Sequence, residues 1–151
     1  MLEALGQAGC SCWLEGGWGI DALAGRQTRL HRDADIDFDA EREAEVLAVL
    51  YNLGYRETLD ERPTRFELVS SDGSCVDLHP IRLQASGDAV QIAHDGIVWH
   101  FRAAWFTTGA ILGQRVPCYT VDGQRYFHSG YELRDVDVED LRVLDQLDRS
   151  E

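Results

Sequence analysis

Carboxylate and apolar residues alternate along the stretch from Asp33 to Asp39. Successive side chains of a β-strand point to opposite faces, so the pattern predicts a strand with one acidic and one apolar face. The acidic face carries Asp33, Asp35, Asp37 and Asp39. Residues two apart on a strand lie roughly 6.5 Å apart, which allows neighbouring carboxylates to bind one divalent cation. The alternative interpretation is an acidic edge strand that faces solvent.

A glycine pair and a short helix precede this strand. Residues 10–15 predict a strand that delivers Gly16 and Gly17 to its C-terminal end, and residues 18–24 predict two helical turns capped by Gly25. Paired glycines allow the backbone to approach a phosphate closely, and the first N–H groups of the helix attract an anion. The order strand, glycine turn, helix and acidic strand is typical of the opening of a nucleotidyltransferase.

The same periodicities predict the remaining elements. Helices are expected over residues 1–8, 41–53, 122–129 and 138–147, and strands over 65–69, 75–80, 89–93, 97–101 and, at an edge, 115–119. An Asp-Gly pair lies between the strands 65–69 and 75–80, which indicates a hairpin.

The second strand of that hairpin offers a third carboxylate. Asp77 shares a face with Cys75 and His79, and it reaches the same cation if strand 75–80 lies beside strand 33–39. The alternative is that Asp77 faces solvent, because a buried carboxylate near two others is unfavourable without a metal. Glu67 is the next candidate for the third acid, and His79 is expected to orient its neighbours rather than react.

Residues 26–32 form a basic loop in an acidic protein. Arg29 and Arg32 are candidates for contacts with a triphosphate, because the guanidinium of arginine binds two phosphate oxygens in a bidentate manner. The alternative is that these cations only balance the neighbouring aspartates. His31 is either a further site residue or a hydrogen-bonding residue that positions the acidic strand.

The amino-acid composition narrows the classes of molecule that the protein is expected to bind. The formal net charge of −13 repels nucleic-acid phosphates and attracts cationic small molecules, or it serves solubility alone. No apolar run approaches the roughly 18 residues of a membrane span, and a signal-peptide pattern is missing. The four cysteines lack zinc-site spacing, and free thiols fit a reducing compartment. We therefore expect a cytoplasmic protein without a nucleic-acid or membrane partner.

Several sequence runs together resemble the small lincosamide nucleotidyltransferases, which are antibiotic-resistance enzymes related to the aminoglycoside 2''-nucleotidyltransferases. The runs are WLEGGWGIDAL (13–23), GRQ (25–27), HRDADIDFD (31–39), DLHPI (77–81), PC (117–118) and FHSGY (127–131). They extend over nearly the whole chain, which makes the resemblance more specific than any single motif.

The resemblance implies an α+β nucleotidyltransferase fold of the polymerase beta-like type, with a mixed sheet and helices packed on one face. It implies transfer of AMP from ATP to a hydroxyl of a lincosamide such as lincomycin or clindamycin, with two Mg²⁺ ions and release of pyrophosphate. Asp33, Asp35 and Asp77 are the expected catalytic residues and metal ligands, and Asp77 is also a candidate general base. Gly16 and Gly17 are expected to face the triphosphate.

Substrate contacts are expected from the second half of the chain. Trp99, with Phe101, Trp105 and Phe106, either walls a drug pocket or fills the core. The resemblance adds His128 and Tyr131 as neighbours of the site. A single domain over residues 1–151 is expected, with its core over about 1–82 and a C-terminal elaboration over 83–151 that shapes the pocket. A homodimer is compatible with the small size, because a partner subunit could complete that pocket.

Three alternative functions stay open from the sequence. The chain could modify an aminoglycoside or a protein side chain with the same chemistry, or it could be a non-catalytic interaction module that retains the fold.

Overall fold

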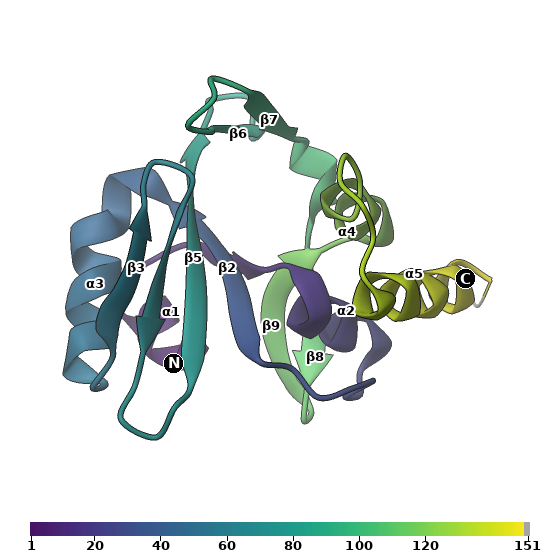
Figure 1. The fold of residues 1–151 in the computed structure, drawn as a ribbon, viewed down its shortest axis with the longest axis horizontal. Coiled ribbons are helices and arrows are strands. Elements are labelled where there is room, and N and C mark those ends of the chain that lie inside the picture. The colour runs from purple at the N-terminus through teal and green to yellow at the C-terminus, as the bar shows by residue number, and fades with distance from the viewer. Residues whose placement is uncertain (150–151) are drawn as a thin grey trace. The chain divides into compact units, whose positions relative to one another are not determined.

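The acidic strand pairs with the strand that carries the third carboxylate. The structure is a computed structural model and describes residues 1–149. Strand β2 (Asp33–Asp39) runs parallel to β5 (Cys75–Leu83), and Asp35 lies opposite Asp77 in their register (Figure 1). This confirms the expectation that strand 75–80 lies beside strand 33–39.

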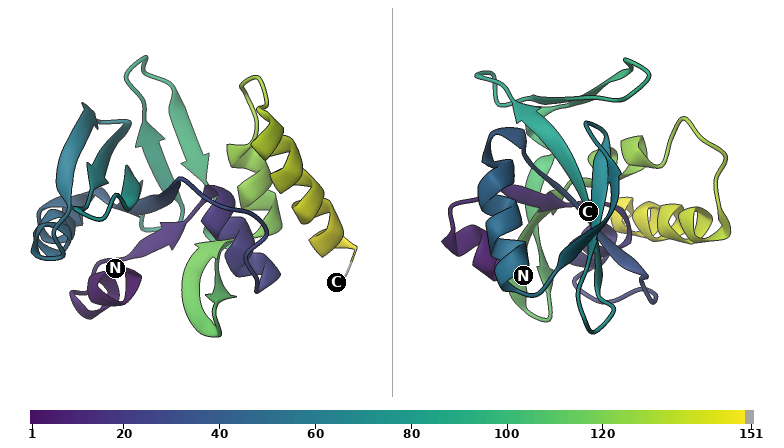
Figure 2. Two further views of the ribbon diagram at one scale, coloured as in Figure 1. Left: turned by 60° about the horizontal axis from the view of Figure 1, so that its bottom comes forward. Right: turned by 60° about the vertical axis from the view of Figure 1, so that its left-hand side comes forward.

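Antiparallel strands extend this sheet on the other side of β5. Strand β4 (Arg65–Val69) pairs with β5, and β3 (Arg56–Glu61) pairs with β4, so the order is β3-β4-β5-β2. The far end of β5 pairs with β6 (Ala89–Ile92), which forms a hairpin with β7 (Val98–Phe101), as Figure 2 shows. The sheet is therefore mixed, as predicted.

Contacts divide the chain into two compact units. Unit 1 comprises Met1–Cys12 and Arg32–Ala103, and unit 2 comprises Trp13–His31 and the chain from Ala104 onward. The acidic strand belongs to unit 1, whereas the glycine pair belongs to unit 2. The organisation as one domain with its core over about residues 1–82 stays a prediction.

The apolar face of the unit 1 sheet forms the core of that unit. Ile36, Phe38, Phe66 and Leu78 are fully buried, and the rings of Phe38 and Phe66 meet edge to face at 5.9 Å. Helices α1 (Leu2–Gln7) and α3 (Glu43–Asn52) lie on one side of this sheet (Figure 2). A 3₁₀ turn, η1 (Ala40–Arg42), leads from β2 into α3.

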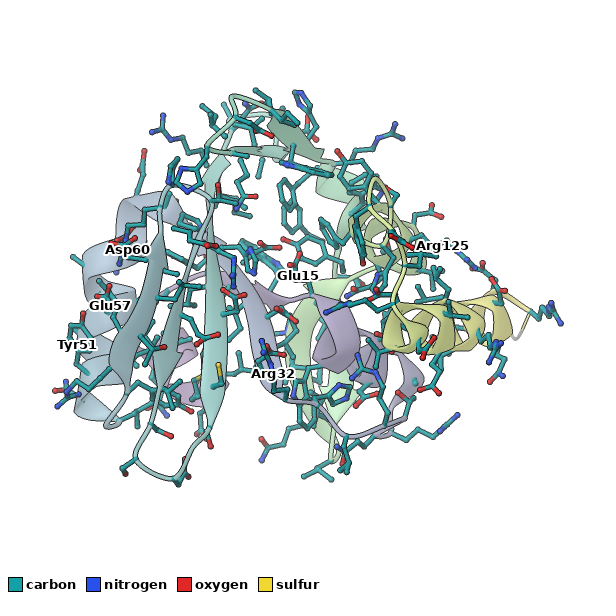
Figure 3. The ribbon with its side chains drawn as sticks, in the orientation of Figure 1. Glu15, Arg32, Tyr51, Glu57, Asp60 and Arg125 are labelled. Carbon is teal, nitrogen blue, oxygen red and sulfur yellow. The ribbon has the colours of Figure 1, made fainter. Side chains whose placement is uncertain are left out.

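Arg62 ties the edge of the unit 1 sheet to α3. Its guanidinium contacts Glu43 at 2.8 Å, Glu57 at 3.1 Å and Asp60 at 2.9 Å, and it lies 3.7 Å from the ring centre of Phe66. Figure 3 labels Glu57 and Asp60 on β3. Stacking on an aromatic ring and pairing with several carboxylates suits the planar guanidinium of arginine.

Unit 2 contains a second group of strands covered by helices. Strand β9 (Gln114–Tyr119) pairs in parallel with β1 (Cys12–Leu14) and antiparallel with β8 (Phe106–Ile111), after the 3₁₀ turn η2 (Ala103–Trp105). Helix α2 (Gly16–Ala24) packs against β8 and also contacts α4 (Val121–Phe127) and α5 (Asp135–Asp148).

Three details of the sequence prediction were wrong. Helix α2 begins at Gly16 rather than Trp18, so the glycine pair forms its first turn. Strand β9 is not an edge, because β8 covers its outer side. Strands β3 and β8 were not predicted: β3 is a largely exposed polar strand, and β8 has no alternation of buried and exposed residues that could reveal it.

Among the described residues, no helix is both long and apolar enough to cross a membrane.

Close packing of α2 on β8 requires a glycine at position 109. A Cβ atom added there would lie 2.3 Å from the carbonyl oxygen of Ala22. We expect Gly109→Ala to lower the free energy of unfolding by about 1–3 kcal/mol, because the helix must move away from the strand. Gly6→Ala is the matched control, since a Cβ at Gly6 in α1 meets nothing within 4 Å.

Urea denaturation of both variants tests this prediction. The control should gain stability by up to about 1 kcal/mol, because alanine is favoured over glycine in a helix. A Gly109→Ala protein as stable as wild type would show that the helix and strand are not packed so closely.

Candidate active site

Three acidic residues form a row across the unit 1 sheet. Glu67 on β4 and Asp35 on β2 both lie opposite Asp77 on β5. Side chains of directly opposed residues share one face of a sheet. The row therefore places three carboxylates on the face opposite the apolar core.

One carboxylate oxygen of Asp77 accepts a hydrogen bond, and the other has no hydrogen-bond partner among the described residues. Nη1 of Arg65 donates a hydrogen bond of 2.6 Å to Oδ2, and the Arg65 guanidinium also contacts Glu61 at 2.9 Å. Oδ1 is buried and has no hydrogen-bond partner among residues 1–149, and the residue is only 6% exposed. Burial raises the pKa of Asp77 above its usual value, although His79 and Arg65 oppose this effect. The alternative of a solvent-facing Asp77 is thereby excluded.

Asp35, Asp77 and His79 together form a group that can hold a cation. Nε2 of His79 lies 3.8 Å from Oδ2 of Asp77 and 3.9 Å from Oδ1 of Asp35. One candidate ligand atom from each residue lies within 4.8 Å of the others. The open, buried oxygen of Asp77 fits a divalent metal ion, because hard cations prefer carboxylate oxygens and a buried oxygen without a partner is unfavourable.

Glu67 fits this role less well than Asp77. Its Oε1 accepts a hydrogen bond of 3.0 Å from the hydroxyl of Thr58. Burial and the nearby Glu67 raise the pKa of the Cys75 thiol to about 12, so this cysteine stays protonated. Glu67 is thus held by the Thr58 hydroxyl, whereas Oδ1 of Asp77 is buried without a hydrogen-bond partner among residues 1–149.

Asp33 lies one step along the same face and has a different partner. Its register partner is Cys75, and Nε and Nη2 of Arg32 donate to its Oδ2 at 3.0 and 2.5 Å. The Arg32 side chain, labelled in Figure 3, is 80% exposed. The structure therefore does not bring Asp33 into the group of Asp35, Asp77 and His79, and its role as a ligand stays a prediction.

The other two carboxylates of β2 differ from each other. Asp37 is buried at 1% exposure, so its side chain does not face solvent. The side chain of Asp39 accepts a hydrogen bond of 3.1 Å from the backbone N–H of Glu41 and caps η1. Neither position could be told from Asp35 by the alternating pattern alone.

In unit 2 the glycine pair opens helix α2 and lies against the basic loop. A Cβ atom at Gly17 would lie 2.3 Å from Nδ1 of His31 and 2.6 Å from Nη2 of Arg29. Gly17 is therefore required by the packing of these two side chains, in addition to any approach of a phosphate. The phosphate-binding roles of Gly16, Gly17, Arg29 and Arg32 stay predictions.

Two buried carboxylates that the sequence analysis did not assign hold the basic loop in place. Nε2 of His31 lies 2.5 Å from Oδ2 of Asp21, and Nε and Nη2 of Arg29 donate to Asp140 at 2.8 and 2.7 Å. No sequence signal links Arg29 to Asp140, which lies 111 residues further along the chain. Asp21 lies within the WLEGGWGIDAL run, where its helical position gave no indication of this partner.

The remaining predicted site residues divide between the two units. Trp99 lies half-buried on β7 in unit 1. In unit 2, Nδ1 of His128 lies 2.8 Å from the carbonyl oxygen of Gln124 and Nε2 lies 3.5 Å from Asp140, whereas Tyr131 is exposed. Contacts of Trp99, His128 and Tyr131 with a substrate stay predictions.

Three of the four aromatic residues considered for a drug pocket pack within their own unit. Phe101 belongs to the core of unit 1. In unit 2, Trp105 packs on Tyr126 at 5.0 Å, and Phe106 packs between Trp13 at 4.7 Å and Tyr119 at 5.3 Å. Phe101 is therefore a core residue, whereas Trp105 and Phe106 are half-buried, and a contact of these two with a substrate stays a prediction.

Comparisons with known proteins identify the family. The profile of the aminoglycoside-2''-adenylyltransferases matches residues 1–144. A lincosamide resistance protein of Staphylococcus haemolyticus is 39% identical over 132 residues, which cover 87% of this chain and 82% of that protein. The resemblance to lincosamide nucleotidyltransferases is thereby confirmed.

Solved structures share the fold. The crystal structure of the lincomycin-bound lincosamide antibiotic adenylyltransferase LnuA superposes with a TM-score of 0.87 and 36% identity, over 97% of this chain and 92% of that one. The complex of ANT(2'')-Ia with adenylyl-2''-tobramycin gives a TM-score of 0.73 at 24% identity, over 98% and 88% of the chains, a likeness of fold alone. The predicted α+β nucleotidyltransferase fold is confirmed, and the chain is a nucleotidyltransferase that belongs to the aminoglycoside-2''-adenylyltransferase family.

Proposed function

We propose that this enzyme transfers AMP from ATP to a hydroxyl of a lincosamide such as lincomycin or clindamycin, releasing pyrophosphate and inactivating the drug. The observation that carries the proposal is the open, buried Oδ1 of Asp77 beside Asp35, in a chain that matches the lincomycin-bound LnuA over 97% of its length. The net charge of −13 agrees with an acceptor that carries a basic amine.

Asp35 and Asp77 are the residues we assign to the metal, with Asp33 as a further ligand and His79 beside them. These residues would hold two Mg²⁺ ions, whose positive charge would stabilise the negative charge that develops during the displacement. Asp33 can join only if its carboxylate exchanges Arg32 for the cation. The exposure of Arg32 makes this exchange easy, because a surface ion pair contributes little stability.

Asp77 is also the group to which we assign acceptance of the proton from the attacking hydroxyl. A bond forms between the acceptor hydroxyl oxygen and the α-phosphorus, the bond from that phosphorus to pyrophosphate breaks, and the hydroxyl proton passes to Oδ1 of Asp77. Oδ1 lies beside Asp35 and has no hydrogen-bond partner among residues 1–149, which leaves a lone pair that can accept this proton. Arg65 occupies Oδ2, so Oδ1 is the oxygen that remains either for the metal or for the proton.

The triphosphate is assigned to the glycine pair and to two arginines of the basic loop. Helix α2 begins with the glycine pair and has 9 residues, so the first backbone N–H groups and the positive end of its dipole are available to an anion. Arg29 and Arg32 are the side chains we assign to the phosphates. Trp99, His128 and Tyr131 are proposed neighbours of the acceptor, and a homodimer in the cytoplasm is the proposed form of the enzyme.

An aminoglycoside is the second candidate acceptor. The family description that matches residues 1–144 favours it, because that family is named for adenylylation of aminoglycosides. The lincosamide is preferred, because the lincosamide resistance protein matches 87% of the chain.

Mass spectrometry of the drug tests the proposal directly. Lincomycin, clindamycin and kanamycin are incubated separately with the protein, ATP and Mg²⁺. We expect a mass gain of one AMP on a lincosamide, and its loss when EDTA removes the metal. A gain on kanamycin alone would replace the lincosamide by the second candidate, and no gain on any of the three would contradict the proposal.

Variants of the acidic row test the assigned residues. We expect Asp35→Ala to abolish transfer and Asp77→Asn to lower kcat by about 10²–10⁴-fold, the usual effect of losing a general base. The control is Asp39→Asn on the same strand, where an amide oxygen can still accept from the N–H of Glu41.

Steady-state kinetics and circular dichroism measure these effects. Both site variants should retain the wild-type fold, and the control should retain wild-type activity. An active Asp35→Ala enzyme would refute its assignment to the metal.

A further inference from the structure

Arg29 and His31 are each held by a carboxylate that lies far inside unit 2. Arg29 meets both oxygens of Asp140, a residue of α5 that is nearly fully buried. Nε2 of His128 lies 3.5 Å from Oδ2 of the same carboxylate. Although burial opposes it, hydrogen bonds from Arg29 and His128 lower the pKa of Asp140 to about 2. Asp140 is therefore a permanent anion that links α5 to the basic loop.

Asp21 holds His31 in the same manner. Its Oδ1 accepts hydrogen bonds from the backbone N–H of Thr28 at 2.9 Å and from the Thr28 hydroxyl at 2.5 Å. Its Oδ2 lies 2.5 Å from Nε2 of His31. Because a carboxylate oxygen accepts, this contact favours the tautomer with its hydrogen on Nε2, and the ring is held with Nδ1 toward Gly17.

The two held side chains converge on one point, the first turn of α2. Nδ1 of His31 and Nη2 of Arg29 both lie within 2.6 Å of the position that a Cβ of Gly17 would take. The Arg29 side chain remains 22% exposed. Its hydrogen bonds to Asp140 and to the carbonyl of Leu30 leave guanidinium N–H donors unused among the described residues.

A purely structural role explains this arrangement poorly. A buried ion pair is weak evidence for stability, because desolvation of the charges offsets their attraction and an apolar pair often serves as well. A rigid cation with unused donors at the start of a helix instead suits recognition of phosphate oxygens, which arginine binds with a fixed geometry.

We propose that Asp140 and Asp21 are positioning residues for binding of the oligophosphate part of the nucleotide. Asp140 orients the guanidinium of Arg29 toward the phosphates, and Asp21 holds the buried ring of His31, which packs with Arg29 against Gly17. The inference rests on the proposed function, because it takes a nucleoside triphosphate as the donor. His128 contributes indirectly, because its contact with Asp140 helps to position that carboxylate against Arg29. This gives the histidine of the FHSGY run a role in phosphate binding that needs no contact of its own with the phosphates.

Calorimetric binding of two probes tests this inference. Tripolyphosphate reports the phosphate contacts alone, and adenosine reports the rest of the nucleotide site. We expect Asp140→Asn to weaken tripolyphosphate binding about tenfold or more, the size of one charge-assisted hydrogen bond, with adenosine binding unchanged. Asp21→Asn should change binding in the same direction.

Asp145→Asn is the matched control. Asp145 lies on the same helix, is 53% exposed and pairs with Arg125 at 2.8 Å, so its loss should leave both probes unaffected. If Asp140→Asn does not fold, Arg29→Lys serves instead. Lysine keeps a positive charge beside Asp140 but loses the paired hydrogen bonds, so the same selective loss is expected.

The outcomes separate this inference from the proposed function. Tripolyphosphate binding at wild-type strength in folded Asp140→Asn and Arg29→Lys, an equal loss of both probes, or no tripolyphosphate binding by the wild type would overturn the inference. A wild-type protein that shows the selective pattern but transfers AMP to no drug would support the inference and contradict the proposed acceptor.

Discussion

The parallel pairing of β2 with β5 is the constraint on which the acidic site depends. It sets Asp35 directly opposite Asp77, although two carboxylates on adjacent strands repel each other. The apolar face of the same strands fixes this register. A slip by one residue would turn Ile36 and Phe38 out of the core, so the buried face holds the acids together against their repulsion.

Arg65 determines which oxygen of Asp77 remains for binding. Its hydrogen bond to Oδ2 neutralises part of the negative charge of Asp77 and Asp35, and it leaves Oδ1 as the oxygen of Asp77 without a partner. In unit 2 the roles are reversed, because the buried carboxylates of Asp140 and Asp21 hold the side chains of Arg29 and His31. In both units the charged group that we propose binds a ligand is already paired with a side chain of the opposite charge, Asp77 with Arg65 and Arg29 with Asp140.

Local patterns were sufficient to predict much of this architecture. The alternation over 33–39 and the Asp-Gly hairpin gave β2, β4 and β5, and the family resemblance singled out Asp77. The partners of these residues could not be predicted, because Arg65 on Asp77 and Asp140 on Arg29 depend on tertiary packing, which leaves no periodic signal. For the same reason the sequence could not show that Asp37 is buried while Asp35 stays accessible.

The most direct measurement of the central claim is the anomalous scattering of Mn²⁺ in crystals of the protein, with Mn²⁺ in place of Mg²⁺. The account predicts a peak at about 2.0–2.6 Å, the usual range of hard-cation–oxygen distances, from a carboxylate oxygen of Asp35 and from Oδ1 of Asp77, with Arg65 still on Oδ2. A peak elsewhere, or none at saturating Mn²⁺, would contradict the claim that this pair of strands forms the metal site.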